Sequence, residues 1–204
     1  MRVPNAAFFQ TIGLLAVPGF LDADWRERVR DAMDRGRRAE GTVGSDGPDY
    51  VVDPAYRRTK VVDVGDELRA AMKARLMELA PALSAHYKVP LTDCQRPQFL
   101  SYGPGDFYKA HRDGSASPTG AALSTSRRIS AVIFLNEQSE TPGPESFGGG
   151  ALTFYELFDD PAARNLGIPL DPEPGLLITF GADVLHAVAP VTHGERRTIV
   201  SWYV

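Results

Sequence analysis

The central stretch of this chain is Gln95-Arg-Pro-Gln-Phe-Leu-Ser-Tyr-Gly-Pro-Gly-Asp-Phe-Tyr-Lys-Ala-His111-Arg-Asp113-Gly. It predicts two short strands joined by a Gly-Pro-Gly turn, and the second strand carries His111 and Asp113. Residues i and i+2 of a strand point to one face, so the imidazole and the carboxylate should lie side by side. They would supply two of the three ligands of a 2-His-1-carboxylate iron site. His-x-Asp alone is a weak motif, so its meaning depends on the rest of the chain.

Length and composition are those of an ordinary globular domain. The 204 residues are 43% hydrophobic and 24% charged, and we expect one domain over residues 1–204. The net charge of -4 speaks against a nucleic-acid-binding face, which usually needs a basic stripe. The single cysteine, Cys94, cannot form an intramolecular disulfide, which favours a reducing compartment, the cytoplasm. No apolar run reaches transmembrane length, so we expect no membrane partner.

The periodicity predicts an α+β fold that is mainly β. Residues 1–94 should form a helical flank with N-terminal strands, beginning with a strand over 8–16. One helix should be capped by Asp22 or Asp24 and end at Gly36, and a second should start at Asp66 and restart at Pro81. Residues 95–204 predict a double-stranded β-helix (jelly roll) with the helices packed on one sheet. Its expected strands are 96–102, 106–113, 128–135, 150–155, 175–180, 184–190 and 196–203.

Two later segments add to the His-x-Asp motif. His186 falls on a strand after a tight turn, 73 residues beyond Asp113, which is enough chain to cross a jelly roll and return. On the last strand Arg196, Thr198 and Trp202 share one face. An arginine inside a barrel is costly unless it meets an anion, and its fork matches a carboxylate. The pattern therefore favours a site for a dicarboxylate cosubstrate.

The chain resembles the Fe(II)/2-oxoglutarate-dependent dioxygenases, and among them the prolyl 4-hydroxylase-like branch. The resemblance spans nearly the whole chain. It rests on these matching segments: Leu14–Leu21, Phe99–Asp113, Ile129–Asn136, Gly148–Leu152, His186–Val191 and Gly194–Trp202. It implies a hydroxylase of an aliphatic C–H that uses Fe(II), 2-oxoglutarate and O2, with ascorbate as an optional addition, and that releases succinate and carbon dioxide.

The resemblance also implies roles for individual residues. His111, Asp113 and His186 match the iron ligands. Arg196 matches the partner of the distal carboxylate of 2-oxoglutarate, with Thr198 assisting, and Tyr102 matches a tyrosine that contacts the cosubstrate. His111, Asp113, His186 and Arg196 would thus carry the catalysis.

The sequence indicates the residues that contact the substrate less specifically than it indicates those for the metal and the cosubstrate. Tyr108 and Trp202 are candidates for the substrate pocket, although each could equally be plain core. Arg127 and Arg128 begin the next strand, and we expect one of them, Arg128, to reach the mouth, with a surface ion pair as the alternative. Arg197 and His193 are expected to face solvent. Loops 40–49, 114–126 and 137–147 are polar and are expected to cover the site.

Three functions stay open from the sequence. A hydroxylase of a prolyl residue in a protein or peptide comes first. A hydroxylase of a free amino acid or other small metabolite comes second. The third is a non-catalytic, metal- or ligand-binding jelly roll or a cupin-like isomerase, against which Arg196 and Thr198 argue because such modules need no 2-oxoglutarate. The sequence leaves the oligomeric state open.

Overall fold

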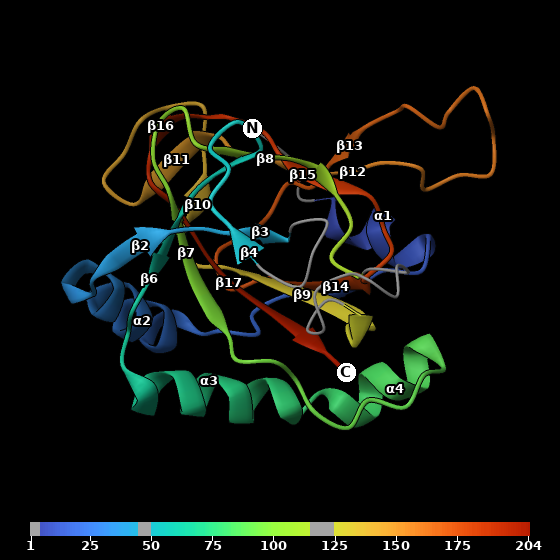
Figure 1. Ribbon diagram of the computed structural model, residues 1–204, viewed down its shortest axis with the longest axis horizontal. Coiled ribbons are helices and arrows are strands. Elements are labelled where there is room, and N and C mark those ends of the chain that lie inside the picture. The colour runs from blue at the N-terminus through green and yellow to red at the C-terminus, as the bar shows by residue number, and fades with distance from the viewer. Residues whose placement is uncertain (1–4, 45–49, 115–124) are drawn as a thin grey trace.

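The computed structural model describes residues 5–44, 50–114 and 125–204 (Figure 1). Its helices are α1 (Ala6–Thr11), α2 (Ala23–Arg35), α3 (Asp66–Met77) and α4 (Ala80–Tyr87). The larger sheet has the strand order β1 (Leu15–Val17), β14 (Leu177–Gly181), β9 (Ile129–Phe134), β17 (Arg196–Tyr203), β7 (Gln98–Tyr102), β6 (Lys60–Val62) and β2 (Arg38–Glu40). The smaller facing sheet has the order β13 (Ile168–Pro169), β12 (Leu152–Phe154), β15 (His186–Val188), β8 (Phe107–His111) and β5 (Arg57–Arg58).

Two further sheets lie at the edges of the barrel. One contains β10 (Glu137–Gln138), β11 (Ser146–Gly149) and β16 (Val191–Gly194), and the other contains β3 (Val43–Gly44) and β4 (Tyr50–Val51). All described strand pairs are antiparallel except β10 with β11. The mainly β architecture with helices on one sheet agrees with the fold class expected from the sequence.

Strand alternation divides the buried side chains between two cores. On β9, Ile133 packs outward against the helices, whereas Phe134 packs inward between the sheets. On β17, Ile199 and Tyr203 belong to the outer core with Leu76 of α3. Figure 1 shows α3 and α4 running beneath the larger sheet. The barrel interior is therefore lined by the inward face of each strand, whereas these helices pack on the outer face of the larger sheet.

The helix boundaries follow the predicted signals. The Asp22 carboxylate accepts a hydrogen bond of 2.9 Å from the backbone N–H of Trp25, and Gly36 ends α2. The second predicted helix is divided into α3 and α4, with Pro81 in the first turn of α4. Proline is tolerated there because the first helical N–H groups have no partner within the helix.

The strand predicted over residues 8–16 is wrong for its first half, since α1 occupies Ala6–Thr11 and β1 begins only at Leu15. Phe9 is fully buried and packs 5.2 Å, between ring centroids, from Phe154 of the inner core. The amide of Gln10 donates to the Ala16 carbonyl and folds the segment back on itself. Short apolar runs do not distinguish a helix from a strand, and tertiary packing decided this one.

Two predictions around the site also need correction. β8 ends at His111, so Asp113 lies just after the strand rather than on it. The predicted loop 137–147 contains β10 and the start of β11, and Gln138 within it is buried with its amide on the Gly149 carbonyl. Of the other two predicted loops, residues 45–49 and 115–124 lie outside the described residues.

Replacement of Leu76 by alanine should test the contact between the helices and the sheet. Leu76 is fully buried in the outer core, so Leu76→Ala should lower the free energy of unfolding by about 2–5 kcal/mol. Guanidinium unfolding measures this loss. Glu67→Ala on the exposed face of α3 should change it by no more than about 0.5 kcal/mol. Equal losses in the two variants would contradict the packing described here.

Candidate metal and anion site

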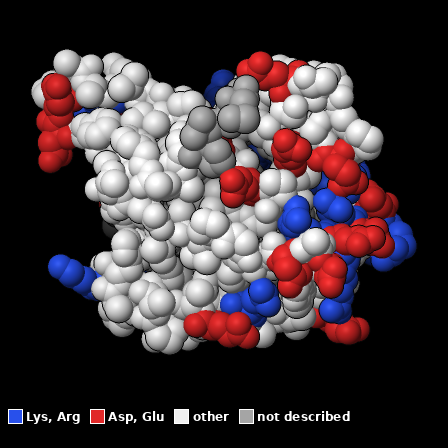
Figure 2. Space-filling model, turned by 180° about the vertical axis from the view of Figure 1, so that it is seen from behind, with Lys and Arg blue, Asp and Glu red and all other residues white. Residues whose placement is uncertain are grey.

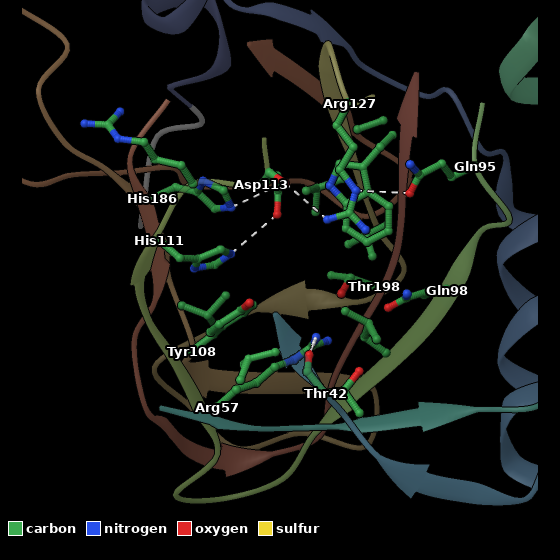
Figure 3. A pocket seen from close by; sticks show the side chains of 18 of the residues that line it. Thr42, Arg57, Gln95, Gln98, Tyr108, His111, Asp113, Arg127, His186 and Thr198 are labelled. Carbon is green, nitrogen blue, oxygen red and sulfur yellow. Dashed lines mark hydrogen bonds and ion pairs between the residues drawn. The ribbon is translucent and has the colours of Figure 1, made fainter. Parts of the chain in front are cut away.

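Three potential metal ligands converge inside the barrel. His111 Nε2 lies 3.6 Å from Asp113 Oδ1, and His186 Nε2 lies 3.5 Å from Asp113 Oδ2. One ligand atom from each residue lies within 4.8 Å of the other two. The histidines come from adjacent strands, β8 and β15, in which they are register partners. Figure 3 shows both imidazoles directed toward the Asp113 carboxylate.

The backbone fixes which nitrogen of each histidine is free. His111 Nδ1 lies 2.8 Å from the Lys109 carbonyl, and His186 Nδ1 lies 2.9 Å from the Val184 carbonyl. Because a carbonyl oxygen only accepts, each Nδ1 must donate a proton. Nε2 of each ring is then left on the side facing Asp113, and a hydrogen bond from the other ring nitrogen is common in metal-ligating histidines.

The charge states also suit a divalent metal. Burial lowers the pKa of His186 to about 4, although the charge of Asp113 acts in the opposite direction, so the ring is neutral at neutral pH. Burial raises the pKa of Asp113, but the neighbouring His186 and His111 and the Ser130 hydroxyl together hold it well below its usual range. Ser130 Oγ donates to Asp113 Oδ2 over 2.7 Å. Two imidazoles and one carboxylate form the facial triad that Fe(II) binds.

Arg196 provides a buried cation in the same cavity. The residue is 1% exposed, and its Nη1 donates to Thr198 Oγ1 over 3.2 Å. Its Nε has no hydrogen-bond partner within the described part of the chain. The guanidinium lies 5.2 Å from the ring centres of both Tyr102 and Phe134.

Arg196 keeps its charge despite this burial. Burial lowers the pKa of its guanidinium to about 10, which still leaves it cationic at neutral pH. A buried charge without a counter-ion is strongly unfavourable, so the site is built for an incoming anion. A carboxylate would occupy the two arms of the fork, and Thr198 could add a third hydrogen bond.

The triad and Arg196 line one cavity of about 1070 Å³. Tyr102, which the resemblance assigned to the cosubstrate, and the two substrate-pocket candidates Tyr108 and Trp202 also line this cavity. Tyr108 stacks on His111 with 3.5 Å between ring centres and 18° between planes. The part that each plays in binding a substrate or cosubstrate stays a prediction.

The expectation that Arg128 reaches the mouth of the cavity is wrong, because the neighbouring Arg127 lines the cavity instead. Arg128 is exposed, whereas Arg127 lines the cavity with its guanidinium 3.7 Å from the Trp202 ring centre. Arg127 also donates to Gln95 Oε1 and to the Asp113 carbonyl. Both arginines precede Ile129, where β9 begins, so strand alternation could not choose between them.

The remaining predictions, for Arg197, His193 and the loops, agree with the structure only in part. Arg197 lies outside the cavity lining, but it does not face solvent as expected, because its side chain is half-buried in ion pairs with Asp34 and Glu195. His193 was also expected to face solvent, but it is half-buried on β16, and it does not line the cavity. The described part of loop 137–147 does not line the cavity either, whereas Thr42 and Val43 of loop 40–49 do.

Sequence reasoning missed Arg57, which is buried and lines the cavity from β5. The neighbouring Arg58 is exposed. A pair of consecutive arginines in a short strand gives no sign of which one faces inward.

Within the described residues, no helix is long and apolar enough to cross a bilayer.

Comparison with known proteins agrees with this geometry. The family model described as "2OG-Fe(II) oxygenase superfamily" matches residues 97–204. A PKHD-type hydroxylase of Klebsiella pneumoniae (strain MGH 78578) is 28% identical over 162 residues, which cover 79% of this chain and 64% of that protein. A PKHD-type hydroxylase of Janthinobacterium sp. (strain Marseille) is 29% identical, covering 93% of this chain and 77% of the relative. The chain thus spans about two-thirds to three-quarters of these relatives.

Solved structures share the fold. A prolyl-4-hydroxylase from Pseudomonas putida superposes with a TM-score of 0.68 at 23% identity, covering 97% of this chain and 95% of that one. A prolyl hydroxylase from Trichoplax adhaerens, solved with a hypoxia inducible factor oxygen degradation domain peptide fragment, also gives 0.68, at 18% identity and 97% and 86% coverage.

The chain belongs to the 2OG-Fe(II) oxygenase superfamily, a superfamily of oxidoreductases. Its fold is similar to that of the solved prolyl hydroxylases, and these neighbours confirm its mainly β jelly-roll class. Membership in the superfamily implies Fe(II) as the metal cofactor and 2-oxoglutarate and O2 as cosubstrates, and the His-Asp-His group fits the metal.

Replacement of a triad residue should remove metal binding. Asp113→Ala and His186→Ala each delete one of three ligands, so Fe(II) affinity measured anaerobically by calorimetry should fall at least about 100-fold. His193→Ala is the matched control, because this histidine lies outside the cavity and should leave the affinity unchanged. Retained affinity in both triad variants would place the metal elsewhere.

Proposed function

We propose that this protein hydroxylates a prolyl residue of a protein or peptide, with consumption of 2-oxoglutarate and O2. The observation that carries the catalytic part is the buried guanidinium of Arg196 in the same cavity as His111, Asp113 and His186. The names of the two solved prolyl hydroxylases and the peptide in the Trichoplax adhaerens structure support a prolyl peptide as substrate. A free amino acid or small metabolite is the alternative.

The side chains have separate tasks in this proposal. Nε2 of His111, Nε2 of His186 and the Asp113 carboxylate hold Fe(II) on one side, because their other polar atoms are already engaged. Arg196 and Thr198 bind the distal carboxylate of 2-oxoglutarate, and Tyr102 lies against that cosubstrate. The chemistry supplied by the bound metal is oxidative decarboxylation to succinate and carbon dioxide, coupled to insertion of one oxygen atom into a C–H bond.

The cavity walls support exclusion of water from the reacting atoms. Tyr108 covers one face of the His111 ring, and Trp202 lies under Arg127 on another wall. In this proposal Tyr108 and Trp202 border the space in which the substrate meets the metal.

Ascorbate is proposed only as an auxiliary reductant, on the resemblance to the prolyl 4-hydroxylase-like branch. The cytoplasm is proposed as the compartment, supported by one buried, unpaired Cys94.

Arg196→Ala should raise the 2-oxoglutarate concentration needed for half-maximal succinate release by roughly 100-fold or more, since a buried charge pair is lost. Arg197→Ala is a control from the same strand and the opposite face. It should leave that concentration unchanged. A normal 2-oxoglutarate requirement in Arg196→Ala would overturn the anion-site assignment.

Mass spectrometry after turnover tests the reaction itself. Protein loaded anaerobically with Fe(II) and 2-oxoglutarate is exposed to O2 with a library of proline-containing peptides and free amino acids. We expect succinate together with a peptide that has gained one oxygen atom on proline. Oxygen gained only by a free amino acid would favour the alternative. Oxygen gained nowhere, with no succinate beyond the level of His111→Ala, would contradict the proposed function.

A further inference from the structure

The cavity has more positive charge than its own acidic groups neutralise. Its lining includes six lysine or arginine side chains. Three of them pair with carboxylates, namely Lys73 with Asp93, Arg96 with Asp66, and Arg112 with Glu156. Arg57, Arg127 and Arg196 form no ion pair with a carboxylate of the described residues. Arg196 is assigned above to the cosubstrate, so two guanidinium groups are left without a counter-ion.

Arg57 is the more deeply buried of these two. It is 8% exposed, and its register partner across the sheet is Tyr108. The guanidinium carbon lies 4.8 Å from the Tyr108 ring centre, and Nη1 donates to the Thr42 carbonyl over 2.7 Å. A Cβ added at Gly41 would lie only 2.9 Å from Arg57 Nε, so the absence of a side chain there leaves room for the guanidinium.

One arm of the Arg57 fork is available to a ligand. Nε is enclosed and has no partner within the described part of the chain. Nη2 also has no hydrogen-bond partner there, but it is not among the fully enclosed unpaired atoms. Figure 3 shows Arg57 extending from the wall below Tyr108 into the pocket, on the side opposite Arg127.

The acidic residues of the wall do not neutralise Arg57. The Asp53 carboxylate accepts a hydrogen bond of 2.9 Å from the Ala55 backbone and forms no ion pair with Arg57. Asp113 is engaged by the two histidines and Ser130.

We propose that Arg57 binds a carboxylate of the substrate, so that the enzyme selects anionic substrates. This inference rests on the proposed hydroxylase function, because it assigns Arg57 to the substrate of that reaction. The carboxylate could belong to an acidic residue near the target proline of a peptide or to a small acid. A charge-assisted hydrogen bond from a largely desolvated guanidinium would give the selectivity.

The cosubstrate does not account for Arg57. Arg57 comes from β5 of the smaller sheet, whereas Arg196 comes from β17 of the larger sheet. Arg196 already combines a free guanidinium arm with Thr198 and Tyr102, and Tyr102 is its register partner on β7. The two cations therefore stand on facing walls of the barrel, and each can receive a different anion.

Matched carboxylate and carboxamide probes test the inference. The first pair is N-acetyl-L-proline with N-acetyl-L-prolinamide, and the second is a hexapeptide containing Asp-Pro with its Asn-Pro counterpart. Binding is measured by calorimetry on anaerobic protein loaded with Fe(II) and 2-oxoglutarate. In at least one pair the carboxylate should bind about tenfold or more tightly than the amide. The pair that shows this preference identifies the source of the carboxylate.

Arg57→Gln should abolish that preference without changing the affinity for 2-oxoglutarate. Arg57→Lys, which keeps the charge but lacks the planar fork, should retain part of it and also serves if the glutamine variant does not fold. Arg58→Gln is the matched control, because Arg58 is exposed, stacks on Phe107 and does not line the cavity. It should keep the full preference.

Three results would overturn the proposal. The first is the lack of a carboxylate preference in both probe pairs. The second is an unchanged preference in Arg57→Gln. The third is a loss of 2-oxoglutarate affinity in Arg57→Gln as large as the loss of affinity for the carboxylate probe. Admission of O2 separates this inference from the proposed function. Carboxylate binding that depends on Arg57, without oxygen gained by any prolyl probe, would refute prolyl hydroxylation and leave the anion site standing.

Discussion

Two ionised groups of opposite sign, the Asp113 carboxylate and the Arg196 guanidinium, are held inside one barrel without forming a pair. Asp113 is stabilised by two imidazoles and a serine hydroxyl, whereas among the described residues the Arg196 guanidinium contacts only the Thr198 hydroxyl and aromatic faces. Burial of either charge costs several kcal/mol unless a partner compensates. Binding of a metal cation at Asp113 and of a carboxylate ligand at Arg196 would each compensate one of these two buried charges. The charge imbalance is therefore the feature on which the assignment of function depends.

The geometry that keeps these charges apart comes from strand alternation. On β17, Arg196 and Thr198 face the cavity, while Ile199 and Tyr203 pack on the helices and anchor the strand. The Tyr203 hydroxyl donates to the Leu76 carbonyl and ties β17 to α3. Charged side chains on the face of the molecule seen in Figure 2 are of both signs and gather toward the side where Figure 1 shows α2. The unpaired positive charge described above is a feature of the interior.

The sequence was sufficient to place a side chain wherever the two-residue period of a strand related it to another residue. Arg196, Thr198 and Trp202 were placed correctly because a strand has a period of two, and the triad followed from spacing and resemblance. It was insufficient where a segment begins or ends. Arg128 was expected in the wall in place of Arg127 because both precede β9, and α1 was taken for a strand because its apolar run is short. Arg57 gave no signal, since its burial depends on pairing between β5 and β8, two segments about fifty residues apart.

A crystal structure of the protein loaded anaerobically with Fe(II) and 2-oxoglutarate, with anomalous scattering recorded at the iron edge, tests the central claim most directly. We predict one iron peak bound by His111, Asp113 and His186. The distal carboxylate of 2-oxoglutarate should lie on Arg196 and Thr198, with Arg57 left free of the cosubstrate. An iron peak at another position, or a distal carboxylate bound to Arg57 instead of Arg196, would contradict the account.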